Sequence, residues 1–504
     1  MAFSGRFGNL SDTMFRLKPP VDIMVPHAGD GATLKRTLSI WQLAAIGVAC
    51  TVGTGIFVTF SQVVPAAGPG VLISFVIAGV TAGLTALCYA EVSSKIPSAG
   101  SSYSYTYASL GEIAAYLVGW CLLLEYSVST AAVASGWSGY LNDLLANVVH
   151  IDIPDWAAFA THAVYRTVGE GENAQQVYDH IAYGVNFPAV LLVFLCALLL
   201  IKGTSESART NAIMTTIKLA VLAFFAFVAF FGFRASNLHP FAPHGVSGIG
   251  TAAGLVFFSY IGMDAVSTAA EEVENPRKAL PKALLLALVI VTGIYLLVAL
   301  AAVGARPSGA FTKNETAPLA AILREVTGWT WTSSLLSAAA VISIFSVTLV
   351  TLYGQTRVLH SMSSDGLVPK VFSRVSPRTR TPIGGTVVVA LFVAVLTGLV
   401  PLDILADFVS LGTLVAFAVV SATVVILRRR GQGEPDSFQV PFYPVLPFAS
   451  IGACLYLMYT LADSPHGWLT YSMFGVWMTI AVVVYFAYAR HHAVLAEQES
   501  ASAT

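Results

Sequence analysis

The sequence has very little charge. Lys, Arg, Asp and Glu make up only 11% of its 504 residues, whereas about a quarter of residues are charged in soluble globular proteins. Hydrophobic residues make up 56%, and no charged residue occurs between Arg36 and Glu91. This composition excludes an ordinary soluble protein and indicates a chain that is solvated mainly by lipid.

We expect neither a disulfide framework nor a cleaved leader, and the sequence has no hydrophilic stretch long enough for a soluble domain. Its five cysteines all fall inside apolar segments and read as small packing residues. The first 36 residues contain Arg6, Arg16, Lys18 and Asp22 without an early apolar run, which predicts a cytoplasmic tail and no signal peptide. We therefore predict a tail at 1–39, one membrane domain at 40–490 and a second cytoplasmic tail at 491–504.

Twelve apolar segments are long enough to cross a bilayer as helices. They lie near 40–64, 69–92, 110–141, 183–201, 211–233, 249–270, 283–305, 330–360, 383–402, 404–427, 444–462 and 467–489. We expect an all-α polytopic membrane protein with twelve transmembrane helices.

The basic residues predict the orientation of these helices. With the N-terminus inside, 20 of the 26 Lys and Arg residues face the cytoplasm. Five face outside, namely Arg166, Arg234, Arg306, Lys313 and Arg324, and Lys218 lies within a segment. An excess of basic residues on the cytoplasmic side is the rule for membrane proteins. Both termini should therefore be cytoplasmic, in a multi-pass protein of the cell membrane.

Lys218 is the only charged residue between Arg209 and Arg234. At about 1.5 Å per helical residue it lies roughly 13 Å inside its segment, where a lysine costs on the order of 3 kcal/mol to insert. It should face protein or a water-filled cavity, and bind a partner or change protonation. A lysine that extends its stem to the nearer headgroups is the alternative.

Other charged residues inside the apolar segments are few. Glu125 is the only charged residue between Glu112 and Asp143, near the middle of its segment. It could meet a cationic substrate side chain, pair with Lys218 or relay a proton. We expect Asp264 to hydrogen-bond a helix break and Asp407 to cap a helix. The predicted outer loop at 142–182 contains His150, His162 and His180, whose spacing matches no metal-ligand pattern.

Two segments contain residues that interrupt helices. Gly47, Gly53 and Gly55 lie within 40–64, and Gly262 lies within 249–270. A break at membrane depth is tolerated only where the freed backbone groups line a cavity or bind a ligand, although close helix packing also uses glycine. The two segments are five apart, so the first ten could form two inverted halves around a midplane site.

Several motifs in order resemble one known family. They are GTGIF at 53–57, EVSSKIPSAGSSY at 91–103, FFSYIGMD at 257–264 with EEVENP at 271–276, YGQTR at 353–357 and SDGL at 364–367. The chain resembles the amino acid-polyamine-organocation superfamily, and within it the cationic amino acid transporters of bacterial type. The resemblance covers roughly residues 35–430. It implies a five-plus-five inverted repeat, similar to the leucine transporter fold, with helices 1 and 6 broken.

The resemblance also implies a substrate site. The substrate carboxylate would bind backbone amides of Val52, Gly53, Thr54 and Gly55. The substrate ammonium would meet carbonyls of Phe258, Ser259 and Ile261, with Tyr260 as an aromatic wall or gate. An anion at the start of the helix near Ile56 is also favoured by free N–H groups and the helix dipole.

Lys218 also fits the resemblance, because proton-coupled bacterial members carry a lysine where sodium-coupled relatives bind the ion. A protonated lysine could bridge helices 1, 5 and 8, and a neutral one would release them. The candidate contacts are the carbonyl of Gly47 or Val48 and the hydroxyl of Ser343 or Ser346.

We therefore expect a secondary amino acid transporter that imports substrate with protons by alternating access. An exchanger and a sodium symporter remain alternatives. A channel or a multi-pass enzyme is disfavoured, because neither a filter-like segment nor a catalytic cluster is present. We expect the partners to be an amino acid, protons and the bilayer, with no cofactor, metal or nucleic acid. The sequence identifies no small membrane partner and does not distinguish a cationic from a small neutral substrate.

Overall fold

The computed structural model describes most of the chain. The described residues are 14, 16–18, 39–96, 100–168, 175–203, 208–263, 266, 273, 275–312, 315–376, 379, 381–431, 438–464 and 466–494. Asp264 and most of the two predicted tails lie outside these residues.

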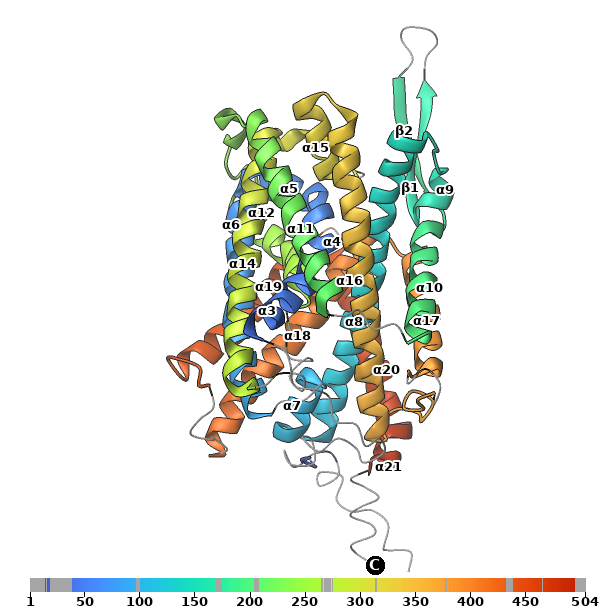
Figure 1. Cartoon of the computed structure of the whole chain (residues 1–504). Helices are drawn as coiled ribbons and strands as arrows, with labels where there is room; N and C mark the ends of the chain where they lie inside the picture. The colour runs from blue at the N-terminus through green and yellow to red at the C-terminus, as the bar shows by residue number, and fades with distance from the viewer. Residues whose placement is uncertain are drawn as a thin grey trace, which may run out of the picture.

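The described helices form an elongated bundle along one axis (Figure 1). A two-stranded hairpin projects at one end, and α21 (Arg490–His492) lies at the other. These are called the hairpin end and the terminal end. The hairpin pairs β1 (Thr161–Val168) with β2 (Gln175–Tyr183) in antiparallel register, with Thr161 opposite Tyr183 and an irregularity between Val164 and Tyr165.

The first half of the bundle consists of α3 (Ile40–Thr51), α4 (Thr54–Val58), α5 (Phe60–Ala67), α6 (Val71–Lys95), α7 (Ser101–Ser109), α8 (Glu112–Leu144), α9 (Asp155–Ala158), α10 (Phe187–Ile201) and α11 (Ala208–Ala229). The second half consists of α12 (Gly245–Val256), the 3-10 helix η6 (Phe257–Tyr260), α14 (Pro276–Ala305), α15 (Pro318–Thr327), α16 (Thr330–Ser364), α17 (Ile383–Leu399), α18 (Leu402–Arg429), α19 (Val445–Ala462), α20 (Gly467–Val484) and α21 (Arg490–His492). Short 3-10 or π turns join several of them.

The predicted apolar segments correspond to helices of the bundle. By length and composition, eight helices among the described residues could cross a membrane. Four shorter apolar helices accompany them, Ile40–Thr51, Phe187–Ile201, Gly245–Tyr260 and Ile383–Leu399. Each of the twelve predicted segments overlaps one of these helices, which confirms the all-helical membrane class. The number that crosses the bilayer stays a prediction.

Four elements were not predicted. The short helices α7, α9 and α15 and the β1–β2 hairpin all lie in predicted connections. The amphipathic α15 buries residues 318–323, and α7 buries every one of its residues although it contains four serines, three tyrosines and a threonine. Their burial depends on the surrounding helices, which is why hydropathy along the chain did not reveal them.

Helix α8 lies at the centre of the bundle. It packs against α16 and α18 and also contacts α7, α10 and α17. Small residues allow these helices to approach closely, as is common between membrane helices. A Cβ added to Gly412 of α18 would lie 2.7 Å from Cδ2 of Leu124, and one added to Gly354 of α16 would lie 2.8 Å from the ring of Tyr126. The central position of α8 places Glu125 in the protein interior.

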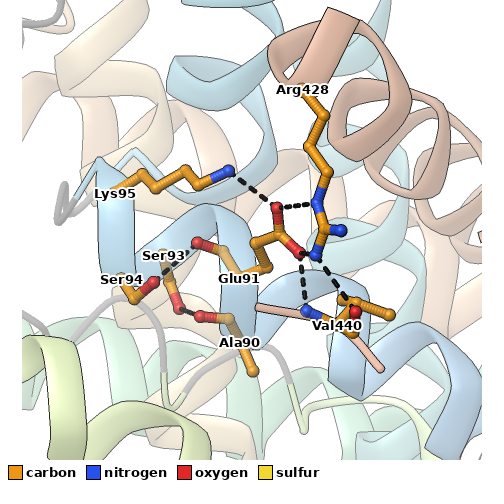
Figure 2. Close-up of polar contacts among 7 residues, drawn as sticks. All are labelled: Ala90, Glu91, Ser93, Ser94, Lys95, Arg428 and Val440. Atoms are coloured by element: carbon orange, nitrogen blue, oxygen red, sulfur yellow. Dashed lines mark hydrogen bonds and ion pairs between the residues drawn. The ribbon is translucent and has the colours of Figure 1, made fainter. Parts of the chain in front are cut away.

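A buried ionic cluster holds the terminal end together (Figure 2). Glu91 of α6 is fully buried and accepts hydrogen bonds from Arg428 Nε at 2.8 Å, Lys95 Nζ at 2.7 Å and the backbone N–H of Val440 at 2.7 Å. Arg428 also lies over the ring of Tyr443 at 4.4 Å. Buried ion pairs need such additional partners to offset desolvation. The cluster ties α6 to α18 and to the segment before α19.

Candidate functional site

The first broken helix is the centre of the candidate site. Helix α3 ends at Thr51, and α4 begins at Thr54, with Val52 at φ −76°, ψ 83° and Gly53 at φ −125°, ψ −150° between them. All five residues of α4 are buried. Thr59, in helical conformation, joins α4 directly to α5. The predicted break near Gly53 is therefore present and lies inside the protein.

This break releases three backbone carbonyls. In an unbroken helix the carbonyls of Ala49, Cys50 and Thr51 would accept bonds from residues 53, 54 and 55. Instead, the N–H of Gly53 turns back to the carbonyl of Thr51 at 2.9 Å. A carbonyl freed at membrane depth needs another donor. The carbonyls of Ala49 and Thr51 are contacted by side chains of other helices, and that of Cys50 lies against Gly262.

Lys218 contacts the first of these freed carbonyls, that of Ala49. Its Nζ lies 2.9 Å from the carbonyl oxygen of Ala49, and the side chain is fully buried. The residue lies midway along α11, which packs against both α3 and α16. A cation at the C-terminal end of α3 is also favoured by the helix dipole. The lysine therefore reaches the break and does not extend to the membrane surface.

Tyr295 of α14 connects the two broken helices. Its hydroxyl lies 2.9 Å from the carbonyl oxygen of Thr51 and 2.8 Å from that of Ser259, and it can donate to either. Tyr295 is fully buried, and its ring packs edge-on against Tyr260 with ring centroids 5.4 Å apart. The sequence analysis missed this residue, because a tyrosine in an apolar helix carries no local signal of what its hydroxyl reaches.

The second break follows η6. Ile261 is extended, and Gly262 has φ +98°, in the region that favours glycine. A Cβ on Gly262 would also lie 2.7 Å from the carbonyl oxygen of Cys50. Gly262 is thus required both by its own conformation and by contact with the first break. The two breaks pack directly against each other.

A small cavity lies at this junction. It has a volume of about 30 Å³, far below the roughly 300 Å³ of a typical small-molecule site. Of the predicted substrate residues, Gly53, Thr54, Gly55, Glu125, Phe258 and Ile261 line it. Val347 and Thr351 of α16 and Tyr126, Ser129 and Val133 of α8 complete most of its wall. In this conformation the central cavity is therefore smaller than a small-molecule ligand needs.

The other predicted substrate residues lie beside the cavity without lining it. The N–H of Val52 bonds the carbonyl of Val48 at 2.8 Å. The carbonyl of Ser259 accepts from Tyr295, and the hydroxyl of Tyr260 donates to the carbonyl of Phe75 at 3.0 Å. In this conformation Tyr260 therefore braces η6 against α6. The amides of Thr54 and Gly55 are the better candidates for a carboxylate, because the first N–H groups of a helix have no intrahelical partner.

The predicted coupling residues surround the same break. A Cβ on Gly47 would lie 2.5 Å from Cγ2 of Val266, so this glycine permits close packing, and its carbonyl accepts the Thr51 hydroxyl at 2.8 Å. Lys218 Nζ contacts the carbonyl of Ala49, the residue after Val48, and its proposed contacts with Gly47 or Val48 stay predictions. Ser343 and Ser346 are buried in α16, one turn or less before Val347. Val347 in turn faces Gly53, where an added Cβ would lie 3.2 Å from its Cγ1.

Polar side chains continue along the interface of α8 and α16. Glu125 is 2% exposed and lines the cavity. The Thr130 hydroxyl donates to that of Thr351 at 2.9 Å, and the Gln355 amide bonds Ser127. Among the described residues no group of three or more His, Cys, Asp or Glu could hold a metal ion. One buried acid, Glu125, thus lines the cavity, and one buried cation, Lys218, contacts the first break beside it.

A family model described as amino acid permease matches residues 38–490. The chain belongs to the amino acid permease family. Over 96% of its length this permease is 38% identical to the methylthioribose transporter and to the branched-chain amino acid permease BcaP of Bacillus subtilis, and it covers 99% and 100% of them. It is also 32% identical to human cationic amino acid transporter 4 over 85% of this chain and 64% of that one. These relatives identify a membrane transporter and not an enzyme.

The permease has a second, larger cavity at the hairpin end. Its volume is about 1050 Å³. Gly136 lines this cavity, whereas Thr54 lines the central one, and a Cβ added to Gly136 would collide with Cγ2 of Thr54. The Thr54 hydroxyl donates to the carbonyl of Val133 at 3.1 Å. Thr54 and Gly136 thus form part of a thin partition between the two cavities.

Proposed function

We propose that this permease imports amino acids together with protons by alternating access. The supporting observation is the 2.9 Å contact between Lys218 Nζ and the carbonyl that the first helix break releases at Ala49. A protonated ammonium donates strongly to that oxygen and stabilises the broken conformation. A neutral amine binds it more weakly. Loss of the proton would therefore loosen the break and couple proton release to a change of conformation.

In this proposal the substrate binds at the closed central cavity. The amides of Thr54 and Gly55, at the start of α4, would hold the carboxylate. The carbonyls near Phe258 and Ile261 would hold the ammonium. Glu125 would face the side chain of a cationic substrate or pass protons to Lys218. Because the cavity is small, substrate entry requires α4 or η6 to move apart from α8 and α16.

The proposed topology follows the basic residues and the fold. Twelve helices would cross the cell membrane, with the terminal end and both termini in the cytoplasm. The first ten would form a five-plus-five inverted repeat with the breaks of α3–α4 and α12–η6 in matching positions. The hairpin end would then face outside, so the larger cavity would be the outer approach to the central site.

Transport by purified protein in liposomes tests the proposal. Labelled leucine and arginine should accumulate faster when the outside is acidic, with sodium replaced by choline. Lys218→Ala should lose the stimulation by pH while reaching the membrane in normal amount, and Lys202→Ala, which removes an exposed lysine at the end of α10, should retain it. If uptake by Lys218→Ala were still stimulated by the pH gradient as in wild type, proton coupling through this residue would be contradicted.

Three further outcomes separate the alternatives. Uptake that requires amino acid preloaded inside, without a pH effect, would identify an exchanger. Uptake that requires sodium would identify a sodium symporter. Methylthioribose is the second candidate substrate, because a relative named for its transport matches 96% of the chain. It has neither carboxylate nor ammonium, so transport of methylthioribose alone would contradict the proposed role of Thr54 and Gly55.

A further inference from the structure

The cavity at the hairpin end is strongly acidic. Its lining contains five carboxylates, on Asp155, Glu315, Asp403, Asp407 and Asp463, and two imidazoles, on His244 and His466. No lysine or arginine occurs among the described residues that line it. A cleft lined by one sign of charge and walled by protein focuses its field and concentrates ions of the opposite sign. The cavity should therefore attract cations.

Two of these carboxylates are already paired. Glu315 accepts from Arg306 at 2.7 and 2.9 Å. Burial raises the pKa of the Glu315 carboxyl above its ordinary value, while Arg306 opposes that change. Asp403 lies 2.9 Å from the imidazole of His466 and also bonds the N–H of Ile404 at the start of α18. Glu315 and Asp403 line the cavity, and their negative charges are partly offset by these partners.

Asp407 differs from the others. It is 2% exposed, and its Oδ2 accepts the Ser464 hydroxyl at 2.9 Å. Its Oδ1 is buried and has no hydrogen-bond partner among the residues that the structure describes. Asp403 stands one helical turn earlier on the same helix, and both aspartates line the cavity. A buried carboxylate oxygen without a donor is costly, and a bound cation would supply the missing partner.

We propose that the cavity binds an organic ammonium ion, with Asp407 as the principal carboxylate. A bare metal ion fits less well, because no group of three or more potential metal ligands occurs among the described residues. The lining also includes Phe159, Leu255 and Pro401, which suit methylene groups. This inference rests on the proposed function for its orientation: the hairpin end faces outside, and the ammonium of an arriving amino acid meets Asp407 before it passes the partition at Thr54 and Gly136.

A diamine without a carboxylate tests this site separately from the central one. We would use 1,5-diaminopentane, which cannot use the amides of Thr54 and Gly55, and measure its binding to purified protein and its inhibition of amino acid uptake. Wild type should bind it, with an affinity that falls as salt rises. Pentane-1,5-diol, of similar length but uncharged, should not bind.

Variants then locate the binding. Asp407→Asn should weaken diamine binding at least tenfold, whereas Asp152→Asn removes an exposed aspartate outside the cavity and should leave binding unchanged. Glu125→Gln should retain diamine binding even if it loses transport, because it changes only the central cavity. If Asp407→Asn does not fold, Asp403→Asn should weaken binding in its place, since it removes the neighbouring charge.

Three results would overturn the site. The first is absence of diamine binding to wild type. The second is diamine binding by Asp407→Asn with wild-type affinity. The third is loss of diamine binding in Glu125→Gln while Asp407→Asn still binds fully, which would place the diamine in the central cavity. None of these depends on proton coupling. A failure of pH-driven uptake with diamine binding intact would contradict only the proposed function.

Discussion

Gly55 and Ser259 bring the two broken helices into direct contact. A Cβ atom added to Gly55 would lie 2.6 Å from Cα of Ser259, a separation at which the backbone itself would have to move. The contact joins the start of α4 to η6 beside the central cavity. Any relative motion of the two helices must begin by opening or sliding this contact.

Gly55→Ala should therefore abolish or strongly reduce amino acid uptake. Even one methyl group would push η6 away, and neither backbone can yield cheaply. Uptake in liposomes and the amount of protein in the membrane are the measurements. Gly293→Ala is the matched control, because an added Cβ in α14 meets no atom within 4 Å and should gain about 1 kcal/mol of helix propensity. Normal uptake by Gly55→Ala would show that these helices separate more easily than the contact implies.

Tyr295→Phe should destabilise the closed cavity. The change removes one hydroxyl and leaves the buried carbonyls of Thr51 and Ser259 with one donor fewer, at a cost of about 1–3 kcal/mol. We expect a lower Tm in detergent and an altered KM, with protein still folded. Tyr459→Phe, at a 70% exposed position on α19 outside both cavities, should change neither. A Tm for Tyr295→Phe equal to that of wild type would argue against the bridge.

Gly136→Ala should block passage between the two cavities. The added methyl would collide with Cγ2 of Thr54, so α4 could not keep its position against α8. Thr54→Ser removes that methyl and keeps the hydroxyl that bonds Val133. The double variant should therefore recover a large part of the uptake that Gly136→Ala loses, as expected for residues in contact. No recovery in the double variant would mean that the loss has another cause.

Glu125→Gln should reveal which role the buried acid has. If Glu125 faces a cationic side chain, arginine should compete at least tenfold more weakly for uptake in the variant, while alanine competes as before, because an unpaired desolvated charge costs several kcal/mol. If Glu125 instead pairs with Lys218 or relays protons, uptake of arginine and of alanine should decrease together and the pH profile of uptake should shift. Unchanged competition and an unchanged pH profile would remove Glu125 from the site.

The residue sequence by itself determined the class of protein and the places where its helices break. Apolar runs separated by charge are local properties, so the twelve segments could be found without the fold. Gly53 and Gly262 were also recognisable, because glycine weakens a helix wherever it stands. The isolated charges of Lys218 and Glu125 were visible for the same reason, since charge is costly in any apolar segment.

Only the tertiary structure decided what these groups meet. The partner of Lys218 is the carbonyl of Ala49, a backbone group that exists as a free acceptor only because the helix breaks four residues later. Tyr295 joins two breaks from a third helix, and the acidic cavity gathers carboxylates from helices and loops that are far apart in the sequence. Such contacts depend on how the helices pack in space. The sequence names each residue but does not show whether its carbonyl or hydroxyl has a hydrogen-bond partner.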